Sequence, residues 1–466
     1  MHPALLLLQI ASASQPCAYA GIDAAAICTT VRVPENRQRP SGRQLALSVV
    51  LIPGGGASAA KVAIAFLPGG PGGDIIPQQR AWKSLLADAG AQHPLLFVDP
   101  RGTGASGALR CVLAAEPRRA VSHVRDFLPV AQVRSCRREL ERRADLKQYT
   151  TEAIAHDLDA VRASLGLERL ILFGTSGGTR QALMYLKRYP ERVEAMILSG
   201  MVPSSFRMPM HYAPDAQAAF DSLVRSCRAD IDCARAHPGL RADLDSALST
   251  LQRAPARVGV RLPDGRIDTA IVTRGMFAER MRTAMYNSDA AAQLPYVIRS
   301  AAQRDFAPFV QLMIPGLRPP RREVVAMGHF LSVTCAEDVL RIPLDTARML
   351  AASTFLGMYR VEQQMAACAE WPRADLPADH FEPVRSRVPV LFISGAADPV
   401  TPPRWADSAA VYLPNSVHAV LAHAGHGPLF NECAAQMIAR FLQTRDPHQV
   451  DVRCARSAVR PPFYIP

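Results

Sequence analysis

Residues 170–190 read LILFGTSGGTRQALMYLKRYP, which is an apolar run, a glycine-rich pentapeptide and a mixed polar and apolar run in succession. The apolar run predicts a buried β-strand, and residues 179–188 predict a helix that ends before Pro190. Between them lies Gly-x-Ser-x-Gly, with Ser176 at its centre. A strand, this pentapeptide and a helix have the layout of a nucleophile elbow, where glycines make room for a tight turn that exposes the serine hydroxyl. Ser176 is therefore the candidate nucleophile, and an ordinary strand-to-helix turn is the alternative.

Predicted strands and helices alternate on both sides of this turn. The β-like runs are residues 45–52, 62–67, 95–98, 170–173, 195–198 and 390–393, and helical stretches include residues 154–165 and 434–442. Such alternation predicts an α/β fold with a doubly wound, mostly parallel sheet. Residues 205–375 differ, because they contain helical patterns and few β-rich runs. We therefore expect a core in two parts, residues 30–204 and 376–466, with residues 205–375 inserted between them as a mainly helical cap domain.

Composition narrows the classes of function. The chain has 466 residues, enough for more than one module, and 53 Lys and Arg against 41 Asp and Glu give a formal net charge of +12. The basic residues are scattered, and the densest group, residues 137–143, includes acidic residues as a solvated helix does. This distribution argues against nucleic acid as a partner.

The ten cysteines show neither a Cys-x-x-Cys pair nor the histidine spacing of a zinc site. An even number with local spacing favours disulfides and an oxidising compartment. Buried free thiols are the alternative. Paired in sequence order, the cysteines would form Cys17–Cys28, Cys111–Cys136, Cys227–Cys233, Cys335–Cys368 and Cys433–Cys454.

The N-terminus has features of an export signal. Residues 4–10 form a short apolar region and residues 11–13, Ala-Ser-Ala, offer a small-residue cleavage site, although no Lys or Arg precedes them. We predict a signal peptide at residues 1–13 and an exported protein, periplasmic or secreted. No other apolar run is long enough to cross a bilayer, so we expect no stable membrane insertion.

A serine hydroxyl needs a base to accept its proton, and the base needs an acid to orient it. In the α/β-hydrolase arrangement the acid and then the histidine follow the serine along the chain. Asp398 lies just past the predicted strand at residues 390–393, and His426 lies between Gly425 and Gly427. His423 is the competing base, and a simple Asp-Pro turn is the alternative role for Asp398.

Catalysis by acyl transfer also needs two backbone N–H groups aimed at the developing oxyanion. Gly177, directly after the serine, is the first candidate. The second comes from the glycine loop at residues 67–73, LPGGPGG, with Gly70 preferred and Gly69 next. A flexible turn is the alternative reading of this loop. The mechanism requires no metal and no organic cofactor.

These segments together resemble the prolyl iminopeptidase and tripeptidyl aminopeptidase branch of the α/β-hydrolases, peptidase family S33. The segments that carry the resemblance are residues 67–73, 98–106, 149–151, 157–162, 174–178, 335–338, 368–372 and 425–427, with Cys433 and Cys454. It covers most of the chain but not residues 205–330. The chain departs from the family's usual residues at Pro68, Pro100 and Gly177. Because backbone N–H groups survive these changes, the departures bear on substrate preference and not on the triad.

The resemblance implies an aminopeptidase that acts on small peptides with a free N-terminus, of the tripeptidyl or prolyl type. A substrate ammonium would then meet a carboxylate, for which Glu337 and Asp338 are the candidates, with a structural salt bridge as the alternative. An esterase or lactonase with the same triad is the main rival function, because the triad does not distinguish esters from amides. A non-catalytic binding protein is the second rival. The oligomeric state is left open by the sequence.

Overall fold

The computed structural model describes residue 17 and residues 26–55, 61–87, 92–111, 113, 126–261, 265–313 and 325–466. The predicted signal peptide, residues 1–13, lies outside these described residues. No helix among the residues described is both long enough and apolar enough to span a membrane.

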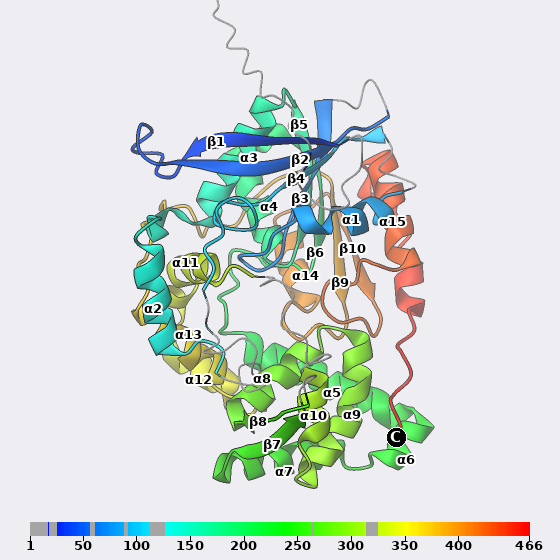
Figure 1. Cartoon of the computed structure of the whole chain (residues 1–466). Helices are drawn as coiled ribbons and strands as arrows, with labels where there is room; N and C mark the ends of the chain where they lie inside the picture. The colour runs from blue at the N-terminus through cyan, green and yellow to red at the C-terminus, as the bar shows by residue number, and fades with distance from the viewer. Residues whose placement is uncertain are drawn as a thin grey trace, which may run out of the picture.

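Within the described ranges, eight strands form one sheet in the order β1-β2-β4-β3-β5-β6-β9-β10 (Figure 1). The pairs β1–β2 and β2–β4 are antiparallel, and every pair from β4 to β10 is parallel. The predicted doubly wound, mostly parallel sheet is therefore confirmed. The strands are β1 (Ile27–Pro34), β2 (Gln44–Ile52), β3 (Val62–Leu67), β4 (Leu95–Val98), β5 (Arg169–Thr175), β6 (Val193–Ser199), β9 (Val390–Gly395) and β10 (Ser416–Leu421).

Helices cover both faces of this sheet, which explains why its central strands are apolar throughout. On β5, Leu170 and Leu172 pack with helices α3 and α4, whereas Ile171 and Phe173 pack with α1 and α15 on the opposite face. Successive residues point to opposite faces of a strand, so both sets are buried. The helices on the sheet are α1 (Gln79–Leu85), α3 (Thr151–Ser164), α4 (Gly177–Arg188), α14 (Arg404–Ala410) and α15 (Glu432–Thr444). Helix α2 (Val130–Leu140) packs instead with the inserted helical region.

Between β6 and β9 the chain forms a mainly helical layer at the carboxyl end of the sheet, which we call the cap (Figure 1). It contains one small antiparallel pair, β7 (Ala256–Arg261) with β8 (Ile267–Val272). The boundaries at residues 205 and 375 stay predictions. The cap helices are α5 (Tyr212–Ala229), α6 (Ile231–Ala236), α7 (Leu240–Arg253), α8 (Arg274–Ala284), α9 (Ser288–Ala302), α10 (Ala307–Met313), α11 (Met327–Glu337), α12 (Leu344–Ala351) and α13 (Tyr359–Ala369).

All ten cysteines form disulfides, and the alternative of free thiols is wrong. The pairs are the five that sequence order gives: Cys17–Cys28, Cys111–Cys136, Cys227–Cys233, Cys335–Cys368 and Cys433–Cys454. Disulfides persist in oxidising compartments, so this feature fits an extracellular protein.

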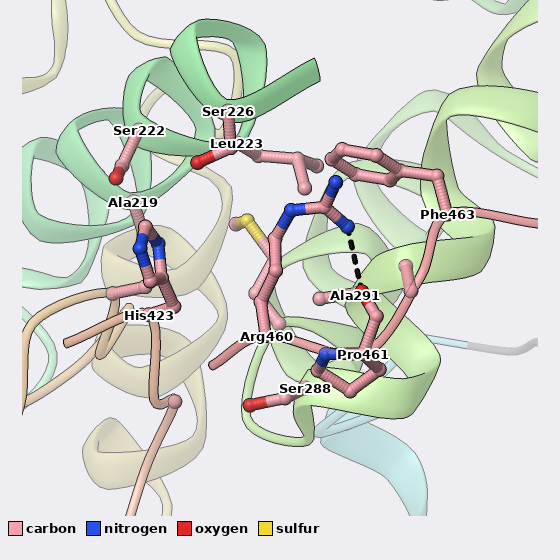
Figure 2. Close-up of a pocket in the computed structure, with 14 residues that line it drawn as sticks. Ala219, Ser222, Leu223, Ser226, Ser288, Ala291, His423, Arg460, Pro461 and Phe463 are labelled. Carbon is pink, nitrogen blue, oxygen red and sulfur yellow. Dashed lines mark hydrogen bonds between the residues drawn. The ribbon is translucent and has the colours of Figure 1, made fainter. Parts of the chain in front are cut away.

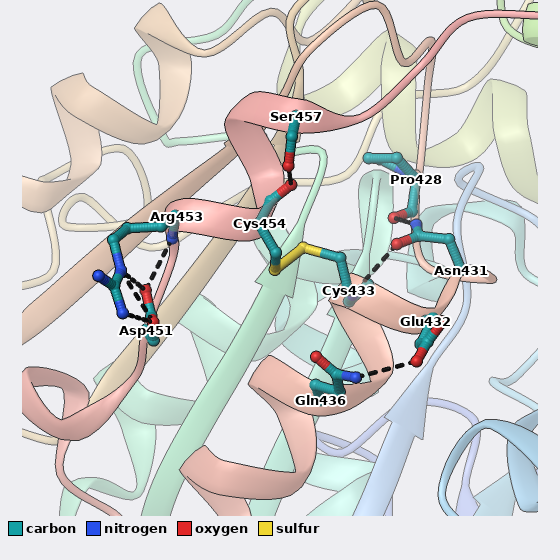
Figure 3. The surroundings of a disulfide bond; sticks show 10 residues. Pro428, Asn431, Glu432, Cys433, Gln436, Asp451, Arg453, Cys454 and Ser457 are labelled. Atoms are coloured by element: carbon teal, nitrogen blue, oxygen red, sulfur yellow. Dashed lines mark hydrogen bonds and ion pairs between the residues drawn. A yellow bond between two sulfur atoms is a disulfide. The ribbon is translucent and has the colours of Figure 1, made fainter.

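The last residues, 458–466, form a segment that we call the C-terminal strap. The Cys433–Cys454 disulfide fixes the chain on α15 just before the strap begins (Figure 3). The strap then extends along the cap (Figure 1), where Arg460 pairs with Asp230 at 2.5 Å and the Tyr464 N–H donates to the Ala292 carbonyl at 3.1 Å. It therefore joins the core, from beside the carboxyl end of β10, to the start of α6 and to α9.

Candidate active site

Ser176 occupies the turn between β5 and α4, as the elbow motif predicts. Its φ of 51° lies in the left-handed region, which is rare for a residue other than glycine and marks a strained turn. A Cβ at Gly178 would collide with the backbone carbonyl of Leu67, so glycine is required for α4 to approach β3 this closely. The turn raises Ser176 from the sheet's carboxyl end into a cavity that lies against the cap.

His426 and Asp398 reach the same region from neighbouring strands. Asp398 follows β9 and His426 follows β10, and these strands are paired in parallel. The His426 Nδ1 lies 2.7 Å from the Asp398 Oδ2, and the side chain of Ser176 lines the same cavity as His426. The His426 backbone N–H also donates to the Tyr286 carbonyl at 2.9 Å, so the cap holds the histidine loop in place.

Asp398 is buried, with 1% of its surface exposed, yet its environment favours the ionised form. Burial alone would raise the pKa of Asp398, but His426 and the backbone N–H groups of Thr401 and Val400 outweigh it and hold the pKa below its ordinary value. The carboxylate also accepts from the Thr401 hydroxyl at 2.9 Å. A negative charge is thereby fixed behind the imidazole, where it can stabilise a histidinium.

The structure brings the three oxyanion candidates together beside Ser176. Gly69 and Gly70 line the cavity, and a Cβ built on Gly69 would lie 3.2 Å from the Ser176 Cβ. Gly177 is the first residue of α4, where backbone N–H groups have no intrahelical partner. The same helix end favours negative charge through its dipole. Gly177 and Gly70 are also in close contact, since a Cβ on Gly177 would lie 2.8 Å from the Gly70 carbonyl oxygen.

His423, the competing base, lies elsewhere. It lines a separate, smaller pocket between α5, α9 and the C-terminal strap, beside Ser222 and Arg460 (Figure 2). Ser176 does not line this pocket. The geometry therefore favours His426 as the base.

Glu337 and Asp338 are not brought to the cavity, and the structure places them in the structural role that was the alternative. Both are fully buried at the end of α11. Glu337 accepts from the Thr151 backbone N–H and hydroxyl, each at 2.7 Å, and Asp338 accepts two bonds from Arg180 at 3.0 Å. Their acceptor capacity serves contacts between the cap and helices α3 and α4.

The same buried network contains His380, whose Nε2 is 3.5 Å from Glu337 and whose Nδ1 is 3.6 Å from Glu152. Burial would lower the pKa of His380, but the attraction of the Glu152 and Glu337 carboxylates outweighs it and raises the pKa. A raised native pKa adds stability below the unfolded value of about 6.5, and this stability is lost as pH rises through the native pKa.

We therefore expect His380→Gln to lower the free energy of unfolding by about 1.5–3 kcal/mol below pH 6, because the buried Glu337 and the partly buried Glu152 lose a charged partner. The difference from wild type should shrink as pH rises above the native pKa. Urea denaturation at a series of pH values measures it, with His156→Gln, on the exposed side of Glu152, as the control. A difference that stays constant with pH would contradict the assignment.

The structure places three charged cap residues on the cavity wall that sequence reasoning missed: Glu279, Arg282 and Arg360. Arg282 donates to Glu279 through Nε at 3.0 Å and Nη2 at 2.6 Å, and the Arg360 Nε is 3.3 Å from the same carboxylate. The spacing of Glu279 and Arg282, three residues apart on a predicted helix, was a signal that could have found the first pair. The sequence around Arg360 contains no comparable signal that would identify it as a cavity residue.

The cavity has a volume of about 560 Å³ and combines this charged group with apolar walls from Phe206, Met208 and Phe330. Among the described residues, no group of three or more His, Cys, Asp or Glu side chains is placed to hold a metal ion. The arrangement can bind a small partly apolar molecule, expose its carbonyl group to Ser176 and stabilise charge at the Gly70 and Gly177 turn.

Comparison with known proteins agrees with this geometry. A family model described as alpha/beta hydrolase fold matches residues 48–243, and one described as TAP-like protein matches residues 353–454. A tripeptidyl aminopeptidase of Streptomyces coelicolor is 25% identical, over 93% of this chain and 84% of that protein. The serine protease Hip1 of Mycobacterium tuberculosis is 25% identical, over 82% of this chain and 78% of the relative.

A carboxylesterase B of Mycobacterium tuberculosis is 32% identical over 47% of this chain and 44% of its own length. The first family model covers the part of the chain that carries β5, Ser176 and α4, and the second covers the part that carries Asp398 and His426. With the mostly parallel eight-stranded sheet, these matches lead to one conclusion. The chain has the α/β-hydrolase fold.

Proposed function

We propose that this protein is a serine aminopeptidase that removes short peptides or single residues from a free N-terminus. The observation that carries the proposal is the 2.7 Å contact of His426 with Asp398 in the cavity that Ser176 lines. Relatives named tripeptidyl aminopeptidase and serine protease Hip1, which match most of this chain, support a peptidase.

In this proposal His426 accepts the Ser176 proton as the hydroxyl attacks the scissile carbonyl, and Asp398 stabilises the histidinium that forms. The backbone N–H groups of Gly177 and Gly70, or of Gly69, stabilise the oxyanion. His426 then protonates the leaving amine. Water, deprotonated by His426, finally releases the acyl group from Ser176.

In this proposal the substrate ammonium is bound by Glu279, and not by Glu337 or Asp338, the candidates from the sequence. Glu279 is the acidic side chain among the described residues of the cavity wall. Burial opposes its ionisation, but Arg282 and Arg360 outweigh it and lower the pKa of Glu279. Its Oε2 accepts a hydrogen bond from the Arg282 Nε, and a carboxylate oxygen has two acceptor sites. A substrate ammonium can therefore occupy the second site.

We expect Glu279→Gln to lower kcat/KM for free-amine peptides about 10–100-fold, because a charge-assisted hydrogen bond is lost. N-acetylated peptides should be poor substrates for both proteins, so the ratio of free to acetylated turnover falls in the variant. Anilide hydrolysis measures both rates. Asp221→Asn, a cap carboxylate outside the cavity that pairs with Arg241, serves as the control. An unchanged ratio would contradict the role of Glu279.

The second candidate function is an ester or lactone hydrolase. The relative named carboxylesterase B favours it, although that match covers under half of this chain. The two functions are separated by incubating the protein with unblocked peptides, their acetylated forms and short acyl esters, followed by mass spectrometry. Release of N-terminal residues or short N-terminal peptides from unblocked peptides alone supports the aminopeptidase. Turnover of esters alone would overturn it.

The five disulfides support export to the periplasm or the medium, with residues 1–13 as the signal peptide. Peptides present in such compartments are then the proposed substrates.

A further inference from the structure

The cap wall of the cavity carries more positive than negative charge. Arg282, Arg360 and Glu279 line it with side chains 4%, 3% and 2% exposed, and Glu279 is the acidic member among the described lining residues. A buried charge without a partner is costly, because little solvent reaches it. Here the single carboxylate of Glu279 is shared between two guanidinium groups. The wall is therefore suited to a second anion.

The donors of the two arginines are used unequally. Arg282 directs Nε and Nη2 to Glu279 and donates Nη1 to the Tyr286 hydroxyl at 2.8 Å. The Nε and Nη1 of Arg360 are buried and have no hydrogen-bond partner among the described residues, although Nε is 3.3 Å from Glu279. Arg360 is thus the group with donors to offer.

The orientation of Arg360 is fixed before any ligand arrives. Its guanidinium carbon lies 3.9 Å from the centre of the Phe127 ring and 5.7 Å from that of Tyr212. Such stacking holds a planar guanidinium in one position and leaves the N–H groups at its edge free to donate hydrogen bonds. Burial lowers the pKa of Arg360, and the attraction of Glu279 and Tyr212 offsets this only in part.

We propose that Arg360, supported by Arg282, binds a carboxylate of the substrate beside Glu279, so that the protein prefers peptides with an acidic group in the portion held under the cap. The proposal rests on the proposed function and names its substrate class. A planar guanidinium binds a carboxylate through paired, charge-assisted hydrogen bonds. The apolar walls strengthen this attraction, and a neutral isostere would leave the buried donors unsatisfied.

The carboxylate can come from a Glu or Asp side chain or from the C-terminus of a very short peptide. Peptide anilides with Glu or Gln at each of the first three positions test the first source, because they have no C-terminal carboxylate. Tripeptides and tetrapeptides as free acids or amides test the second. In one of these two comparisons we expect the wild-type kcat/KM to be about 10–100-fold higher for the substrate that carries the carboxylate than for its neutral counterpart.

Arg360→Gln should bring this ratio close to 1, largely by loss of turnover of the acidic substrate. Arg360→Lys keeps the charge without the planar fork and should restore part of the preference. Arg348→Gln, an exposed arginine on α12, is the control and should leave the ratio unchanged. Thermal melts of each variant establish that the protein is folded.

The outcomes separate this inference from the proposed function. If wild-type protein cleaves neutral free-amine peptides and both ratios are near 1, the carboxylate site is wrong and the aminopeptidase stands. If it cleaves no peptide, the aminopeptidase is wrong, and calorimetry on Ser176→Ala protein decides the site. About tenfold tighter binding of a Glu-containing or free-acid tripeptide than of its Gln or amide partner then sustains the inference. Equal affinities overturn it.

Discussion

The Ser176→Ala variant will hydrolyse peptide anilides with a kcat about 10⁶-fold below that of the wild-type protein, because it lacks the hydroxyl that the proposed mechanism uses as the nucleophile. The substituted turn should still fold, since alanine removes one atom from a side chain that does not cap α4. Steady-state kinetics and covalent labelling by a fluorophosphonate measure the loss.

His423→Asn is the matched control for this experiment. Asparagine tolerates the left-handed φ of 58° at that position, and His423 lines the separate pocket of Figure 2. We expect labelling and turnover within about twofold of wild type, the effect of less than 0.5 kcal/mol that a neutral site shows. Fluorophosphonate labelling that persists in Ser176→Ala would place the nucleophile elsewhere and overturn the proposed mechanism.

The Asp398→Asn variant will lower kcat about 10⁴-fold, because an amide can neither hold the imidazole in the required tautomer nor stabilise its cation. The backbone N–H groups of Val400 and Thr401 still find an acceptor in the asparagine carbonyl, so most of the loop's contacts survive. The decrease in kcat and the pH dependence of kcat/KM, compared between variant and wild type, measure the effect of the substitution on His426.

The chain offers a second Asp–His pair as the control for this experiment. Asp407 and His418 are 2.8 Å apart on α14 and β10, and Asp407 is exposed and outside the cavity. Asp407→Asn should leave kcat within about twofold of wild type, because an exposed pair contributes little. A comparable loss in both variants would mean that the effect of Asp398 is structural.

Sequence patterns predicted the fold class and most strands because parallel sheets leave a local signature. Each buried strand is a short apolar run, and the loop after it is where side chains of the α/β-hydrolase arrangement gather. Asp398 and His426 follow this rule, and the structure places them 2.7 Å apart although 28 positions separate them. The edge strands β1 and β10 were missed, because each mixes buried positions with partly or fully exposed ones and so lacks a continuous apolar run.

The cap could not be predicted in the same detail. Glu279 and Arg360 lie on α8 and α13, and only the packing of these helices brings them to one wall. The Glu337 and Asp338 pair shows the converse, since sequence identifies two acids but not that Thr151 and Arg180 already occupy them. Burial and partners depend on three-dimensional contacts, and no local pattern encodes them.

The C-terminal strap changes how the cap can move. A body inserted between β6 and β9 has two covalent joins to the core, on neighbouring strands, and these joins alone would let it rotate about the line between them. The strap adds a third attachment, through Arg460 and Tyr464, on a part of the cap remote from that line. Three attachments that are not collinear remove the swinging degree of freedom. We therefore expect substrates to enter by movement of individual side chains and short loops at the rim of the cavity, which would limit the size of the peptides admitted.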